Sequence, residues 1–183
     1  SVNFENRASN NYFKKNLLKS KFYLEYGSGG TTYFANKLKK KFLSVESDKN
    51  FYKYLDKNLK KNCLLVDFGP VHKFSIPILF NIRKHKLKEK SLAYAENVLK
   101  ILEKKKITPD FVLIDGRYRV LCGLILNKFY FDKKINNFKI IIDDYSSRKH
   151  YHILNKFYFI KKVGRFGVCR KLKKESTENY INK

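Results

Sequence analysis

The sequence is short of cysteine, of long apolar runs and of acidic residues, and each shortage argues against a class of protein. Its three cysteines, Cys63, Cys122 and Cys169, lie far apart and form neither a CxxC pair nor a Cys/His cluster, which argues against a disulfide framework and a zinc site. No apolar run reaches the roughly 18 residues of a membrane span, and the amino-terminal stretch has no apolar signal-peptide segment. We therefore expect a cytoplasmic protein that does not insert into membranes.

Acidic residues number 16 against 41 Lys and Arg, so the formal net charge is +25 at pH 7. A basic excess of this size favours polyanionic partners such as nucleic acid. The cations are mostly Lys, however, and they are scattered through a chain rich in Asn, Ile, Phe and Tyr, which an AT-rich genome would also produce. The charge therefore leaves open both a nucleic-acid partner and a compositional bias without function.

The chain has enough apolar material for one packed domain, with 183 residues of which 43% are hydrophobic. From residue 22 onward, short apolar runs alternate with longer amphipathic stretches, a pattern typical of a parallel sheet covered by helices on both faces. The expected strands are residues 22–27, 42–47, 63–69, 110–116 and 138–145. The expected helices are residues 30–40, 48–60, 90–106, 117–130 and 146–156. We predict a single domain over residues 1–183, with a core from about residue 20 to residue 172 and a flexible tail over residues 173–183.

Two segments depart from this alternation. Residues 157–163 and 166–172 are strand-like runs with a short break between them, which predicts an antiparallel hairpin at the carboxyl end. Residues 68–89 form the longest irregular stretch and contain two of the three prolines. Because long loops in small domains are often functional, we expect this loop to form part of a lid in which His72 contacts the substrate.

Glycines and acids meet at the ends of the expected strands. All five strands carry an acid at that end, and the carboxyl ends of parallel strands share one edge, so these acids form one rim of a site. The glycines of residues 27–30 allow a tight turn and a close approach of a ligand, but Thr32 stands where a pyrophosphate-binding fingerprint has its third glycine. Glu46 follows Gly27 by about 20 residues, the spacing at which an acid accepts hydrogen bonds from ribose hydroxyls. The alternative role for Glu46 is an N-cap or a first-turn charge for the helix that begins near Asp48.

Several stretches resemble, in order, the motifs of class I, Rossmann-like S-adenosylmethionine-dependent methyltransferases. The first four are "LEYGSGGTT" (24–32), "LSVESD" (43–48), "LLVDFGP" (64–70) and "DFVLIDGRYRV" (110–120). A little-characterised bacterial branch of methyltransferase-like proteins is most similar in five stretches taken together: "EYGSGG" (25–30), "DFGP" (67–70), "LIDGRYRV" (113–120), "IIDDYSSRKHYHIL" (141–154) and "VGRFGVCR" (163–170). The resemblance implies an α/β sandwich with a mostly parallel seven-stranded sheet of order 3-2-1-4-5-7-6, a C-terminal antiparallel hairpin and helices on both faces.

The same resemblance assigns residues to the cofactor S-adenosylmethionine. Glu25 would face its ammonium group, Glu46 its ribose hydroxyls and Asp67 its adenine amino group. The full set implied for the cofactor is Glu25, Gly27, Ser28, Gly29, Gly30, Glu46, Ser47, Asp67, Asp115 and Gly116. A rim of carboxylates suits a ligand that carries a sulfonium and an ammonium group, although it would suit other cationic ligands as well.

Methyl transfer to a hydroxyl requires a positioned acceptor and a base that removes its proton. The candidate bases are Asp115, Asp144 and His150, with His152 as a further candidate, and each histidine has a surface or packing role as its alternative. The acids Asp115, Asp143 and Asp144 also resemble the Mg²⁺ ligands of metal-dependent O-methyltransferases. This chain departs from that pattern in having two consecutive aspartates, which could instead cap the next helix, and we assign no metal.

Two arginines stand at the expected cleft, where positive charge at a helix start is unfavourable without a partner. Arg117 and Arg119 either grip an anionic acceptor in fork geometry or form a structural salt bridge with Asp115. We expect an enzyme that methylates oxygen on a small molecule or a sugar unit. The alternatives are an RNA methyltransferase that uses the Lys-rich surface, although an "NPPY"-type motif is absent, and an inactive methyltransferase-like module that binds nucleic acid.

Overall fold

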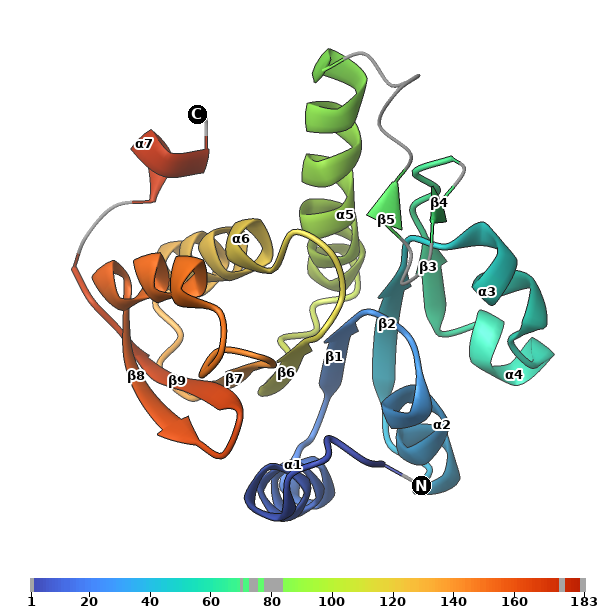
Figure 1. Ribbon diagram of the computed structural model, residues 1–183, viewed down its shortest axis with the longest axis horizontal. Coiled ribbons are helices and arrows are strands. Elements are labelled where there is room, and N and C mark those ends of the chain that lie inside the picture. The colour runs from blue at the N-terminus through green and yellow to red at the C-terminus, as the bar shows by residue number, and fades with distance from the viewer. Residues whose placement is uncertain (1, 70, 73–75, 78–83, 175–176, 182–183) are drawn as a thin grey trace.

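The protein is described here from a computed structural model, which covers residues 2–69, 71–72, 76–77, 84–174 and 177–181 (Figure 1). Its centre is a seven-stranded sheet in the order β3-β2-β1-β6-β7-β9-β8. The strands are β1 (Tyr23–Tyr26), β2 (Phe42–Glu46), β3 (Cys63–Leu65), β6 (Phe111–Ile114), β7 (Lys139–Ile142), β8 (Tyr158–Val163) and β9 (Phe166–Leu172). The first five run parallel, and β9 pairs antiparallel with both β7 and β8. Counted within this sheet, the order is 3-2-1-4-5-7-6, which confirms the predicted fold.

Helices cover both faces of the sheet (Figure 1). They are α1 (Arg7–Lys19), α2 (Gly30–Lys37), α3 (Lys49–Tyr54), α4 (Lys57–Lys60), α5 (Lys84–Lys104), α6 (Arg119–Asp132), the 3-10 helix η3 (Lys149–Lys156) and α7 (Glu178–Ile181). Along β1 the side chains alternate: Tyr23 packs with residues of α1 and α2, whereas Leu24 and Tyr26 pack with residues of α5 and α6. Because both faces are covered, β1 and β6 are buried along their whole length.

The chain packs into the core before residue 20 and after residue 172. Sequence analysis predicted no element over residues 7–19, yet Phe13 and Leu17 of α1 are fully buried and lie one helical turn apart. Residues 173–183 were expected to form a flexible tail. Instead, α7 forms there, and the Tyr180 ring meets Phe157 edge to face at 5.0 Å between centroids. Aromatic packing therefore holds α7 against the domain.

Three helices differ from the predicted ones. The helix expected over residues 48–60 is split into α3 and α4, because Leu55 adopts extended backbone angles between them. The helix expected over residues 146–156 is shorter and is a 3-10 helix, while α5 begins six residues earlier than predicted, at Lys84. No helix in the described part of the chain has the length and apolar character needed to cross a membrane.

The predicted irregular stretch over residues 68–89 is described only in part. It contains a small antiparallel pair, β4 (Val71–His72) and β5 (Ile76–Pro77), and the first turns of α5. The backbone of His72 belongs to β4, but its side chain lies outside what the structure describes, as do Lys73 and Phe74. The predicted lid and the predicted role of His72 in substrate binding therefore stay predictions.

Candidate functional site

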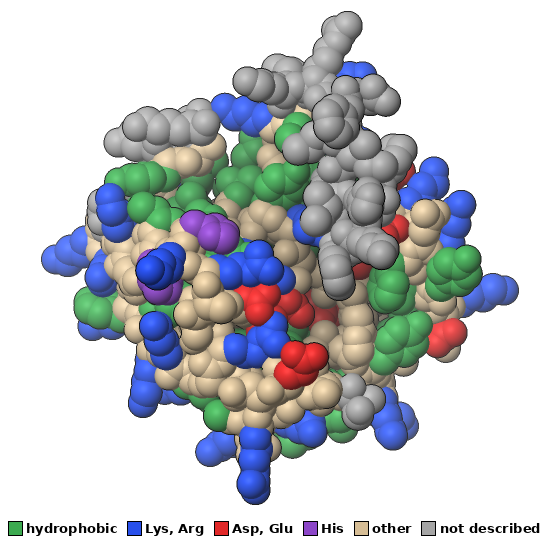
Figure 2. All heavy atoms as spheres, in the orientation of Figure 1, with side chains coloured by type: hydrophobic (Ala, Val, Ile, Leu, Met, Phe, Trp, Pro, Cys, Tyr) green, Lys and Arg blue, Asp and Glu red, His purple; other side chains and the backbone are tan. Residues whose placement is uncertain are grey.

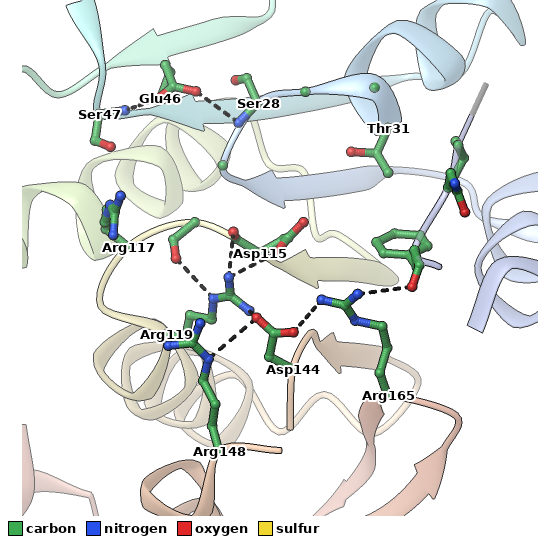
Figure 3. Close-up of a pocket in the computed structure, with 17 residues that line it drawn as sticks. Ser28, Thr31, Glu46, Ser47, Asp115, Arg117, Arg119, Asp144, Arg148 and Arg165 are labelled. Atoms are coloured by element: carbon green, nitrogen blue, oxygen red, sulfur yellow. Dashed lines mark hydrogen bonds and ion pairs between the residues drawn. The ribbon is translucent and has the colours of Figure 1, made fainter. Parts of the chain in front are cut away.

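A cleft of about 660 Å³ opens at the carboxyl ends of the parallel strands, where the sheet topology places ligand sites (Figure 3). It lies in the size range of small-molecule sites. The predicted cofactor residues that line it are Gly27, Ser28, Gly29, Gly30, Glu46, Ser47, Asp115 and Gly116. Three further predicted residues, Arg117, Arg119 and Asp144, line the same cleft. The structure thus brings together residues from the ends of β1, β2, β6 and β7.

Two glycines from neighbouring strands let their loops touch at the cleft. Gly27 has a φ of +93°, and a Cβ built on it would lie 2.6 Å from the Gly116 Cα. A Cβ on Gly116 would in turn lie 2.7 Å from the Gly27 nitrogen. Any side chain at either position would push the loops apart. Gly29 differs, because nothing lies within 4 Å of a Cβ placed there, so its surroundings leave room for a ligand.

Glu25 does not line the cleft but supports the glycine loop from inside. Its side chain is fully buried and accepts hydrogen bonds from the Thr31 and Thr32 hydroxyls, the latter at 2.6 Å. The Thr32 hydroxyl also accepts from the Gly29 N–H at 2.8 Å. Burial raises the pKa of Glu25 to about 8, and the threonine hydrogen bonds oppose that rise. The carboxyl expected to face a cofactor ammonium group is therefore placed behind the loop.

Glu46 is buried and lines the cleft, with its carboxylate fixed by backbone donors (Figure 3). It accepts from the N–H groups of Ser28 at 3.1 Å, Ser47 at 2.7 Å and Asp48 at 2.8 Å. Burial raises its pKa, and the three backbone hydrogen bonds oppose the rise. The N-cap of α3 is Asp48, whose own side chain accepts from Asn50 and Phe51, so the capping role weighed for Glu46 belongs to its neighbour. A carboxylate has about four acceptor positions, so three backbone donors leave capacity for a ligand hydroxyl.

Arg119 joins the ends of β6 and β7. Its guanidinium lies 3.0 Å from an Asp115 carboxylate oxygen and 3.3 Å from Asp144, and it donates to the Asp143 carbonyl at 2.8 Å. It also donates to the carbonyls of Asp115 and Gly116. Of the two roles predicted for Arg119, these contacts are those of a structural salt bridge, and its nitrogens are occupied.

The two consecutive aspartates are also held by arginines (Figure 3). Asp143 is buried, with Arg165 Nε 2.7 Å from its Oδ1. Asp144, with a φ of +58°, pairs with Arg119, with Arg165 and with Arg148, whose Nε lies 3.4 Å from it. The carboxylates that a divalent ion would use are thus neutralised by guanidinium groups. Among the described residues, no group of His, Cys, Asp and Glu is arranged to hold a metal ion.

Two cleft residues at the end of β6 remain available for chemistry. Asp115 is about one-third exposed on its side chain, and burial of the rest raises its pKa, against the opposing effect of Arg119. The Arg117 guanidinium makes no hydrogen bond or ion pair with any residue that the structure describes, and burial lowers its pKa. Its backbone N–H donates to the Tyr94 hydroxyl at 3.4 Å, which fixes the chain at this point.

The remaining predicted residues lie elsewhere. Asp67 accepts from the Gly69 N–H at 2.8 Å and faces Lys49 at 3.8 Å, away from the cleft lining. His150 is exposed and lines a second cavity. His152 packs against the Tyr145 ring, and its Nε2 lies 3.1 Å from the Tyr145 carbonyl oxygen, which is a structural contact.

Sequence analysis missed four parts of the cleft lining. The amino-terminal residues Val2, Asn3 and Phe4 line it, and Arg165 reaches from the β8–β9 turn to donate to the Phe4 carbonyl at 3.0 Å. Besides these amino-terminal residues and Arg165, the cleft lining contains Thr31 and Arg148, which were not predicted there either. Thr31 could have been found from its position in the first turn after the glycines. The others come from segments distant in sequence and carry no local signal.

The comparisons with known proteins agree on the fold alone. No protein-family model matches the chain, and no curated protein matches it. Among solved structures, it is similar to the crystal structure of a methyltransferase-like protein from Silicibacter pomeroyi DSS-3, with a TM-score of 0.73 and 24% sequence identity over 96% of this chain and 91% of that one. The protein therefore has a Rossmann-like methyltransferase fold.

Proposed function

We propose that the protein is an S-adenosylmethionine-dependent methyltransferase that binds its cofactor in the cleft between the β1 and β2 loops and the end of β6. The observation that carries the proposal is the Glu46 carboxylate, buried at the cleft and aimed by three backbone N–H groups. A buried carboxylate fixed in this way suits a vicinal diol, because the ribose hydroxyls would donate hydrogen bonds to the acceptor positions that the backbone leaves open.

The cleft fits the rest of the cofactor as well. The loop over residues 27–30, which has a side chain only at Ser28 and open space at Gly29, would carry the ribose and methionine portion. When bound, the cofactor would supply an activated methyl group on a sulfonium, whose sulfur would keep the electron pair of the carbon–sulfur bond when the acceptor oxygen takes the methyl group. The hydroxyl proton must pass to a base.

Asp115 is the residue we assign to that proton. It stands at the end of β6, lines the cleft and keeps part of its carboxyl exposed. Arg119 forms an ion pair with one of its carboxylate oxygens. Burial raises its pKa, which makes it a better proton acceptor than an ordinary aspartate. Asp144, the other acid predicted for this role, is engaged by three arginines instead.

The acceptor is proposed to be a small molecule or a sugar unit. Lys and Arg side chains are spread over the face that carries the cleft, while Asp and Glu gather near its centre (Figure 2). The net charge of +25 keeps RNA as a second candidate acceptor. Phosphate-backbone binding would show as a steep loss of RNA affinity between low salt and about 150 mM salt.

The proposal is tested by calorimetric titration of S-adenosylhomocysteine into the wild type, Glu46→Gln and Glu103→Gln. Glu103 is an exposed glutamate on α5 that does not line the cleft, so it is the matched control. We expect micromolar binding, a loss of tenfold or more (about 1.4 kcal/mol) in Glu46→Gln and no change in the control. No binding to the wild type, or equal binding to all three proteins, would refute the proposed cofactor site.

A further inference from the structure

A second cavity of about 650 Å³ lies beside the cleft, bounded by α5, α6, η3 and α7. The two share the lining residues Gly116, Arg117, Arg119 and Arg148, so they meet at the segment that enters α6. This segment includes Asp115, the acid proposed to accept the proton. An acceptor in the second cavity would therefore have its reactive end next to the cofactor cleft.

The lining of the second cavity is mainly apolar. It includes Leu87 and Leu92 of α5, Leu121 of α6 and Ile181 of α7, all of which are half-buried. A sugar would leave these side chains against hydroxyl groups, and a nucleic-acid backbone would set them against phosphate. Apolar walls with a few polar groups are instead typical of sites for small molecules with an apolar body.

The charged groups of this lining all have one sign. The cationic side chains are Lys88, Arg117, Arg119 and Arg148, and no Asp or Glu belongs to the described lining. Arg119 pairs with Asp115 and Arg148 pairs with Asp144, and both of these acids line the cofactor cleft. Arg117 stands at the junction of both cavities with no partner for its guanidinium among the described residues. Because partial burial costs a cation that forms no ion pair with a described residue, an anion in fork geometry would stabilise the Arg117 guanidinium.

The backbone at this junction is constrained in a way that suits a binding site. Tyr118, the N-cap of α6, has the left-handed angles φ 48° and ψ 44°, which are unfavourable for a bulky side chain. Its ring stacks on Phe68 at 5.3 Å between centroids and also lines the second cavity. Packing thus holds a strained residue next to Arg117, as is common where a side chain must be aimed at a ligand.

We propose, on the basis of the methyltransferase function above, that the second cavity binds the methyl acceptor and that this acceptor is a small amphiphilic anion. Its apolar or aromatic body packs between α5, α6 and α7, and its carboxylate or phosphate pairs with Arg117 at the junction. This narrows the acceptor from any small molecule or sugar to a hydroxylated apolar acid, and it makes Arg117 the residue that selects for the anion.

A pair of fluorescent probes with the same aromatic body separates the two parts of this proposal. The probe 8-anilinonaphthalene-1-sulfonate carries an anion, whereas N-phenyl-1-naphthylamine is its uncharged counterpart. Both are titrated at about 150 mM salt, because surface lysines also attract a sulfonate. We expect saturable binding of both probes to the wild type. Arg117→Gln should weaken the anionic probe by tenfold or more and the neutral one by less than twofold, whereas Leu121→Gln should weaken both.

Arg7→Gln is the matched control, since Arg7 is an exposed arginine that lines neither cavity. Thermal unfolding of each variant shows whether it is folded. Equal affinity of Arg117→Gln and the wild type for the anionic probe would overturn the proposal, as would failure of the neutral probe to bind. If that happens while S-adenosylhomocysteine still binds through Glu46, only the acceptor inference fails. Probe binding through Arg117 without any S-adenosylhomocysteine binding would overturn the acceptor role together with the proposed function.

Discussion

The two halves of the cleft hold their acidic side chains by different means. On the β1–β2 half, Glu25 is bonded to threonine hydroxyls and Glu46 to backbone N–H groups. On the β6–β7 half, Asp143 and Asp144 are paired with arginines. The backbone donors leave the Glu46 carboxylate some acceptor capacity for a ligand at the cleft, whereas guanidinium groups neutralise the carboxylates that they pair with. We therefore assign ligand binding to the β1–β2 half, called the binding half below, and structural support to the β6–β7 half, called the braced half. Asp115 is the exception, because it lies in the braced half and is proposed to accept a proton.

The largest expected effect comes from removing the central cation of the braced half. Arg119→Met leaves Asp115, Asp143 and Asp144 facing one another without this cation, and its side chain is only 13% exposed. We expect the free energy of unfolding to fall by roughly 3 to 5 kcal/mol, as when one partner of a buried ion pair is removed. Urea unfolding measures this, with the exposed Arg7→Met as control. A loss below about 1 kcal/mol would mean that the network does not brace the sheet.

A smaller effect is expected from the glycine contact that joins the two halves. Gly27→Ala puts a Cβ on a residue with φ +93° and within 2.6 Å of the Gly116 Cα. We expect it to destabilise the fold by about 2 to 4 kcal/mol through strain and overpacking. Gly29→Ala, which meets open space, should cost much less stability and should weaken S-adenosylhomocysteine binding instead. Equal stability losses in the two variants, measured by urea unfolding, would contradict this assignment of roles.

The third prediction concerns pH and the buried acid of the binding half. The pKa of Glu25 is raised from 4.5 to about 8, so its protonated form is favoured in the folded state. The stability associated with that form is fully present below pH 4.5 and is lost as the pH rises to 8. Glu25→Gln cannot ionise, so its free energy of unfolding relative to the wild type should rise by about 2 kcal/mol between pH 5 and pH 8. The upper limit, for a buried site that does not relax, is about 1.4 kcal/mol per pH unit, or roughly 4 kcal/mol over this range.

Urea unfolding at pH 5 and at pH 8 measures this difference, with Glu103→Gln as the control for an exposed glutamate. A difference between Glu25→Gln and the wild type that stays constant over this range would show that Glu25 is ionised in the folded protein at both pH values.

The sequence was informative where a residue's partners are its own neighbours. The apolar runs predicted the strands, and the resemblance implied their order. Glu46 could be placed at the cleft from its position at a strand end about 20 residues after Gly27, and two of its donors, Ser47 and Asp48, follow it directly. Glu25 follows the same local pattern, but nothing in the pattern says that Thr31 and Thr32 turn their hydroxyls inward to meet it. Its burial behind the loop is a property of tertiary packing.

Contacts between residues that are distant in the sequence could not be predicted from the local pattern. Arg165 in the hairpin turn meets Asp143 and Asp144 from about 20 residues away and Phe4 from the other end of the chain. The helix α1 was missed because its apolar residues, Phe13 and Leu17, are few and stand among polar ones. The Arg165 contacts and the burial of α1 both depend on segments that only the fold brings together, so neighbouring residues in the sequence do not predict them.

The most direct test of the difference between the two halves is the affinity for S-adenosylhomocysteine of Glu46→Gln and Asp144→Asn, measured by calorimetry beside the wild type. The account predicts that Glu46→Gln loses tenfold or more, while Asp144→Asn keeps its affinity within about threefold (0.7 kcal/mol) and loses stability in urea. An equal loss of affinity in both variants, or wild-type affinity in Glu46→Gln, would contradict it.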